Sequence, residues 1–196
     1  MTPSSALCCI KRFLPGKLAR KRMSFEDQEA LFLRAERADE RGDLRSANQL
    51  LLEAAQLGHT GAQVTIGNNY SSGHGLRKSL QKAACWYRRA NLAGDESGAL
   101  NLAVDKLKAG NTRAAIFWLR RAIELRSGEA ALELARLYAG RRGGKSKALE
   151  LLKMTQRMRP SEISEQAKED AAALLAALIA STRARTASRL SRQERF

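Results

Sequence analysis

The sequence predicts an all-α fold, an α/α superhelical solenoid of about four helix-turn-helix repeats followed by a C-terminal capping helix. Three observations predict this fold class. Composition favours helices, because the 196 residues contain only three prolines and 5% aromatic residues among abundant Ala, Leu, Glu, Lys and Arg. Apolar residues recur at helical spacing from Ser24 onward. Finally, a unit of two helices separated by glycines repeats every 32 or 33 residues, which is typical of helical solenoids.

The first helix pair is expected over residues 24–58. Ser24 suits an N-cap position, and the acidic residues that follow it complement the positive end of the helix dipole. The apolar stripe of this helix stops at Gly42-Asp43. The second helix of the pair ends at Gly58, because glycine tolerates the left-handed conformation of a C-terminal cap.

Further helix pairs follow, and they are expected over residues 61–94, 98–128 and 129–158. Trp86 and Trp118 lie 32 residues apart at equivalent positions, and Leu151 follows 33 residues later. One pair is too small to bury its own apolar face, so the pairs must stack on one another to be stable. Both tryptophans are therefore predicted to be core residues.

One of these pairs resembles a known family. The positions that carry the resemblance are small and aromatic residues with the glycines of a tight loop: Ala62, Ile66-Gly67, Tyr70, Gly73-His74-Gly75-Leu76, Lys82-Ala83, Trp86-Tyr87, Ala90 and Gly94-Asp95. Together they resemble the Sel-one-like repeat, a relative of the tetratricopeptide repeat. The resemblance covers about residues 60–158 and is strongest in this pair. It implies an α/α superhelix that acts as an adaptor for protein complexes and carries no chemistry of its own.

The two ends of the chain differ from the repeat region at 24–159. Residues 1–23 are basic and free of acids, which predicts a flexible arm or a short organelle-targeting segment. Pro160 ends the last pair, and an apolar face over 160–181 predicts a helix that covers the open end of the solenoid. Residues 182–196, rich in Arg and Ser, are expected to be disordered.

The sequence also bears on the compartment of the protein. No stretch approaches the ~20 apolar residues that a membrane-spanning helix needs. The N-terminal residues lack a secretory pattern. The three cysteines, two of them adjacent, do not suggest a disulfide framework. A reducing compartment and a cytoplasmic location are therefore the simplest interpretation.

The net charge of +15 is not confined to the ends, since residues 54–159 hold nineteen basic and seven acidic residues. Arg88-Arg89 and Arg120-Arg121 coincide in the repeat frame. They predict a ladder of positive charge along the second helices. A solvated outer face is the ordinary interpretation of such a row. The functional interpretations are an acidic protein partner or a nucleic-acid phosphate backbone.

One motif suggests catalysis. Residues 139–146 satisfy a relaxed phosphate-binding loop pattern that ends in Lys145-Ser146. Such a loop follows a buried strand, whereas residues 130–139 have the pattern of an amphipathic helix. We interpret the motif as a basic loop between two repeat helices. With two histidines and no CxxC spacing, a structural zinc site lacks ligands. No catalytic, cofactor-binding or metal-ligating residue is predicted, and the chain is not expected to be an enzyme.

The predicted function is a non-catalytic protein–protein interaction module that binds a partner segment in the concave groove of the solenoid. The first helix of each pair lines this groove. By alignment of the repeats, Asn68, Asp105 and Arg136 face it, and Asn69 and Lys106 lie beside them. Asparagine side chains would hold the partner's backbone while basic rows attract its acidic residues. The alternative is a nucleic-acid-associated factor that uses the basic tails and the arginine ladder.

Overall fold

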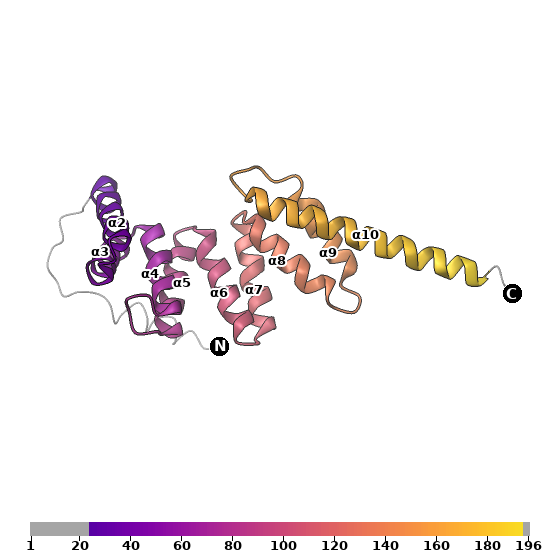
Figure 1. Ribbon diagram of the computed structural model, residues 1–196, viewed down its shortest axis with the longest axis horizontal. Coiled ribbons are helices and arrows are strands. Elements are labelled where there is room, and N and C mark those ends of the chain that lie inside the picture. The colour runs from indigo at the N-terminus through magenta and orange to yellow at the C-terminus, as the bar shows by residue number, and fades with distance from the viewer. Residues whose placement is uncertain (1–23, 194–196) are drawn as a thin grey trace. The chain divides into compact units, whose positions relative to one another are not determined.

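The computed structural model describes residues 24–193, with side chains as far as Ala184, so the predicted N-terminal arm lies outside the described residues. The described part forms nine helices and no strand (Figure 1). The all-α fold class is therefore confirmed. The helices are α2 (Phe25–Glu40), α3 (Leu44–Leu57), α4 (Thr60–Ser72), α5 (Leu80–Leu92), α6 (Glu96–Lys108), α7 (Thr112–Glu124), α8 (Gly128–Ala139), α9 (Lys145–Thr155) and α10 (Glu165–Gln193).

The chain divides into two compact units after Asp105, within α6. In the first unit, α2 packs on α3 and α4 packs on α5, and α3 joins the two pairs by packing on α4. In the second unit, α8 packs on α7 and on α9. The helix pairs predicted over residues 24–58, 61–94 and 129–158 thus pack as pairs.

The helix ends follow from local sequence. Ser24 forms a capping box with Asp27, in which the Ser24 side chain accepts from the Asp27 backbone and the Asp27 carboxylate accepts from the Ser24 backbone at 2.9 Å. Gly58 closes α3 with φ +111°, so the predicted left-handed cap is confirmed. Gly73 and Gly75 have φ values of +94° and +64° in the loop after α4, a conformation that glycine adopts without steric cost.

Small residues let the helices of the first unit approach closely. A Cβ atom on Gly67 would lie 2.5 Å from Cε1 of Tyr87, so the Tyr87 ring packs directly on the α4 backbone. Tyr70 and Trp86 are buried, with 7% and 3% of their surface exposed. These two residues fill the space between the paired helices, as the resemblance implies.

A contact between a lysine and a tyrosine ring occurs at equivalent repeat positions in the two units. Lys82 lies over the Tyr70 ring at 5.0 Å, and at the equivalent positions Lys147 lies over the Tyr138 ring at 5.6 Å. Trp118 departs from this equivalence, because it is only half-buried while its neighbour Leu119 is fully buried. The prediction of a core tryptophan is wrong here, because the inward face of α7 is centred on Leu119.

The last helix covers α8 and α9 at the end of the second unit. Ala167 and Ala171 of α10 are buried, as is Ile163 just before this helix. Helix α10 contacts both α8 and α9. The helix continues beyond residue 181 to Gln193, so residues 182–193 are helical rather than disordered. No glycine or proline interrupts this stretch, and its Ala, Arg and Leu residues favour helix.

Within residues 24–193, no helix combines the length and apolar character needed to span a bilayer. Cys85 on α5 is half-buried and disulfide-bonded. Because disulfides are typical of oxidising compartments, this cysteine gives no support to the inference of a reducing environment.

Candidate functional site

A polar cluster on α4, α5 and α6 contains two of the predicted partner-binding residues. Asn68 is exposed on α4, and its Oδ1 accepts hydrogen bonds from Tyr87 Oη at 2.8 Å and from Asn101 Nδ2 at 3.1 Å. Two donors therefore fix the orientation of the Asn68 amide. No described residue accepts a hydrogen bond from its Nδ2, so these N–H groups face solvent.

Asp105 completes this cluster one turn along α6. Ser71 Oγ donates to Asp105 Oδ1 at 3.0 Å, whereas the buried Oδ2 has no hydrogen-bond partner among the described side chains and backbone groups. Burial, together with the nearby Asp105 carboxylate, which disfavours a second negative charge, raises the pKa of Tyr87 to about 12. Tyr87 thus stays a neutral donor to Asn68. We call Asn68, Ser71, Tyr87, Asn101 and Asp105 the asparagine–aspartate cluster.

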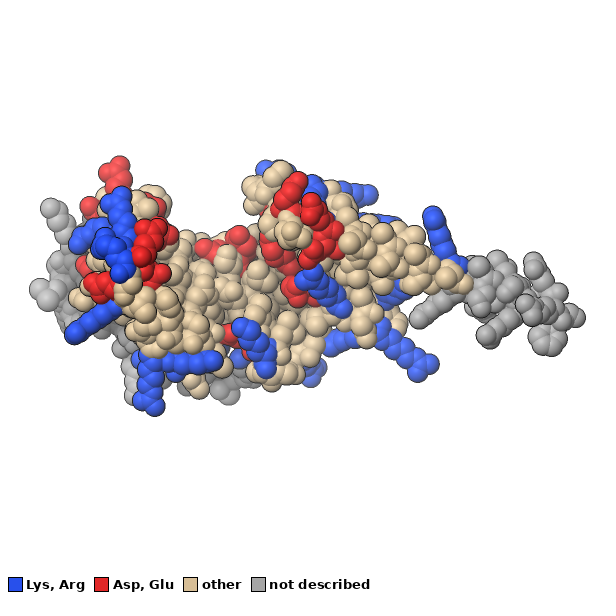
Figure 2. All heavy atoms as spheres, in the orientation of Figure 1, with Lys and Arg blue, Asp and Glu red and all other residues tan. Residues whose placement is uncertain are grey.

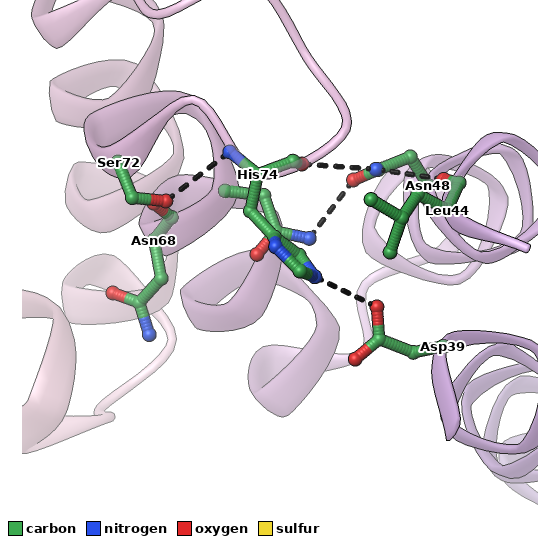
Figure 3. A network of polar contacts seen from close by, with 7 residues as sticks. Asp39, Leu44, Asn48, Asn68, Ser72 and His74 are labelled. Carbon is green, nitrogen blue, oxygen red and sulfur yellow. Dashed lines mark hydrogen bonds and ion pairs between the residues drawn. The ribbon is translucent and has the colours of Figure 1, made fainter. Parts of the chain in front are cut away.

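Asn69 does not belong to this surface. Only 8% of the residue is exposed, and its Nδ2 donates to Asn48 Oδ1 at 2.9 Å. Asn48 Nδ2 donates in turn to the carbonyls of Leu44 and His74 (Figure 3). The placement of Asn69 at a partner-binding surface is corrected, because its side chain joins α4 to α3.

Hydrogen bonds with Asn48 and Asp39 also hold the loop after α4 in place. His74 Nε2 lies 2.9 Å from Asp39 Oδ1 of α2 (Figure 3), and the His74 carbonyl accepts from the buried Asn48. Asn48 is not among the residues predicted from the sequence. Only its unusual position on the apolar stripe of α3, between Ala47 and Leu51, could have identified it.

The remaining predicted groove residues lie in the second unit. Arg136 is exposed on α8 and forms ion pairs with Glu133 at 2.5 Å and with Asp170 of α10 at 2.6 Å. Acidic side chains gather over α8 and the first part of α10 (Figure 2). The Arg136 charge is thus neutralised locally, and the residue joins the capping helix to the last repeat. Lys106 is half-buried.

The arginine ladder is divided between the units, and most of its members have local partners. Arg89 stacks over the Trp86 ring at 4.8 Å. Arg120 Nη2 donates to Tyr138 Oη at 3.1 Å, and Arg121 pairs with Glu124 at 2.8 Å. Arg88 is half-buried. The continuous ladder stays a prediction.

The motif at residues 139–146 forms the end of α8, a loop and the start of α9. The predicted helix before the loop is confirmed. Lys145 Nζ donates to Ser181 Oγ of α10 at 2.5 Å, so the lysine contacts the capping helix. Over the described residues, no group of three His, Cys, Asp or Glu side chains is arranged to hold a metal ion.

Comparisons with known proteins agree with this architecture. No protein-family model matches the chain, and no curated protein matches it. A crystal structure of a Sel1 repeat protein from Oxalobacter formigenes matches with a TM-score of 0.60 and 23% identity over 76% of this chain. The chain has the fold of a Sel1 repeat protein. It spans 63% of the length of that protein's chain. The helical-repeat architecture that the residues of the 61–94 pair predict is therefore confirmed.

Proposed function

We propose that this chain is a non-catalytic protein-interaction module that binds a segment of a partner protein at the asparagine–aspartate cluster. The observation that carries the proposal is the fixed amide of Asn68. Tyr87 and Asn101 both donate to its Oδ1, so its N–H groups are held in one orientation toward solvent. A fixed side-chain amide matches the carbonyl of an extended peptide and loses little entropy when it binds.

Asp105 supplies the complementary group. The Asp105 side chain is half-buried, and its Oδ1, which accepts from Ser71, can accept a second hydrogen bond. An incoming N–H group from the partner segment would donate to this oxygen. Donor and acceptor thus lie in one cluster on neighbouring first helices, which is the arrangement that a peptide backbone needs.

The test compares variants of the full chain in affinity capture followed by quantification of the bound protein. Asn68→Ala together with Asn101→Ala is expected to lower the recovery of the specific partner at least tenfold, which corresponds to about 1.4 kcal/mol. Gln81→Ala, an exposed amide on α5, is the matched control and should leave recovery unchanged. Equal recovery by both variants would show that the partner binds elsewhere.

A specific observation favours nucleic acid as a second candidate. Phe117 on α7 is 63% exposed and packs edge-on against Trp118 at 5.2 Å. Arg113 and Arg120 lie on the same side of this helix. Exposed aromatic rings between arginines are the pattern on which single-stranded bases stack. Binding of an oligothymidine near physiological salt that Phe117→Ala abolishes would support this candidate, and binding that salt alone abolishes would exclude it.

A further inference from the structure

A groove of about 560 Å³ opens between α7, α8 and α9, wholly within the second unit. Its floor is apolar. Leu134 is buried at the base, and Ile123, Leu151 and Met154 are half-buried, so part of each side chain remains exposed to the groove. A volume of this size accommodates large apolar side chains of a ligand, and methionine adapts its shape to different ones.

The rim of the groove carries two cations that one tyrosine holds in place. Arg120 Nη2 donates to Tyr138 Oη at 3.1 Å, and Lys147 Nζ lies 5.6 Å from the centre of the same ring. Both contacts are with a neutral group. Neither cation forms an ion pair with a carboxylate of the described residues, so both keep their full charge at the rim.

The acidic residues of the rim do not balance these charges. Glu124 pairs with Arg121 at 2.8 Å, which leaves Glu150 as the one lining carboxylate without an ion pair in the described part of the chain. The groove therefore combines an apolar floor with an excess of uncompensated positive charge. The complementary ligand has apolar side chains next to carboxylates.

We propose that this groove binds an acidic segment of a partner protein, with a leucine or phenylalanine in the floor and carboxylates paired to Arg120 and Lys147. A nucleic acid fits less well, because the floor is aliphatic and the lining ring of Tyr138 is only 9% exposed and has Lys147 over it. The proposal is independent of the asparagine–aspartate cluster, which lies in the other unit. Failure at either site would leave the other intact.

The test uses random twelve-residue peptides displayed on phage. They are first depleted on the charge-reversed variant Arg120→Glu/Lys147→Glu and then selected on the intact chain. The selected peptides are expected to be rich in Asp, Glu and large apolar residues. Their synthetic forms should bind the intact chain at least tenfold more tightly than the variant, as measured by fluorescence anisotropy. The variant Arg34→Glu/Arg37→Glu on α2 has the same change in net charge and should bind them normally.

A floor variant keeps the test decisive if charge reversal disturbs folding. Met154→Lys places a charge in the half-buried floor and should abolish binding while circular dichroism and the melting temperature stay near those of the parent chain. Recovery of no peptides, recovery of basic peptides, or equal binding by Met154→Lys would overturn the proposal. Stronger displacement of the selected peptides by oligothymidine than by an acidic peptide would overturn it in favour of nucleic acid.

Discussion

His59 stabilises the junction of the first two helix pairs through three contacts that one substitution removes. Its Nδ1 accepts from the backbone N–H of Ala62 at 3.0 Å and so caps the start of α4. Because Nδ1 is the acceptor, Nε2 carries the proton and donates to Glu29 at 2.8 Å. The ring also stacks on Phe32, with centres 4.6 Å apart. Only 9% of His59 is exposed.

These contacts set the size of the effect of His59→Ala. Loss of an N-cap costs about 1 kcal/mol, and loss of the stacked ring costs about 1 kcal/mol. The hydrogen bond to Glu29 adds about 1 kcal/mol, a low value for a carboxylate because Glu29 is 42% exposed. We expect His59→Ala to lower the free energy of unfolding by about 3 kcal/mol.

Urea denaturation followed by circular dichroism measures this change. His59→Asn keeps a capping acceptor but loses both the stacked ring and the hydrogen bond to Glu29, so about 2 kcal/mol of destabilisation is expected. His74→Ala is the matched control, because its pairing with Asp39 is about half exposed on both sides and contributes less than about 1 kcal/mol. A stability of His59→Ala within about 0.5 kcal/mol of the parent chain would refute the reasoning.

Other predictions follow from close packing and from shifted pKa values. Gly98→Ala should lower the free energy of unfolding by about 1–2 kcal/mol, because its Cβ would lie 2.5 Å from the Tyr87 carbonyl oxygen. The control is Gly140→Ala, whose Cβ would have its nearest neighbour 3.9 Å away. In the same urea experiment this control should leave the free energy of unfolding nearly unchanged. Arg159 and Arg126 hold the pKa of Glu162 at about 2, below its ordinary 4.5. The stability that Glu162 contributes is therefore present above pH 4.5 and is lost as the pH falls toward about 2, so the stability difference between the parent chain and Glu162→Gln should vanish over that range. Tyr87 should ionise near pH 12, and Asp105→Asn should lower this pKa, as phenolate absorbance would show.

Each of these predictions has an outcome that contradicts it. Equal stability of Gly98→Ala and Gly140→Ala would mean that α5 and α6 are less closely packed than described. A stability difference at Glu162 that persists at acid pH would mean that its ion pairs do not lower its pKa. An unchanged Tyr87 titration in Asp105→Asn would mean that burial alone sets the pKa.

The sequence alone predicted those parts of the fold that depend on neighbours within a few residues. The capping box at Ser24 and the left-handed cap at Gly58 are local hydrogen-bond and backbone preferences. The repeat spacing likewise predicted the helix pairs, whereas the contacts of Lys82 and Lys147 with tyrosines became apparent only in the structure. Periodicity sufficed for the helix pairs, because the apolar face of a helix must be buried wherever the helix packs.

Only the tertiary structure decided which polar side chains remain available to a partner. Asn68 and Asn69 are adjacent and chemically identical, yet one is exposed and the other is buried against Asn48. Adjacent residues differ by about 100° around a helix, and the repeat alignment does not resolve that rotation. The partner of Asn69 lies 21 residues away, and the rim of the α7–α9 groove is set by Tyr138, 18 residues from Arg120. Such pairings form only when helices dock, because local sequence preferences carry no information about the side chains of another helix.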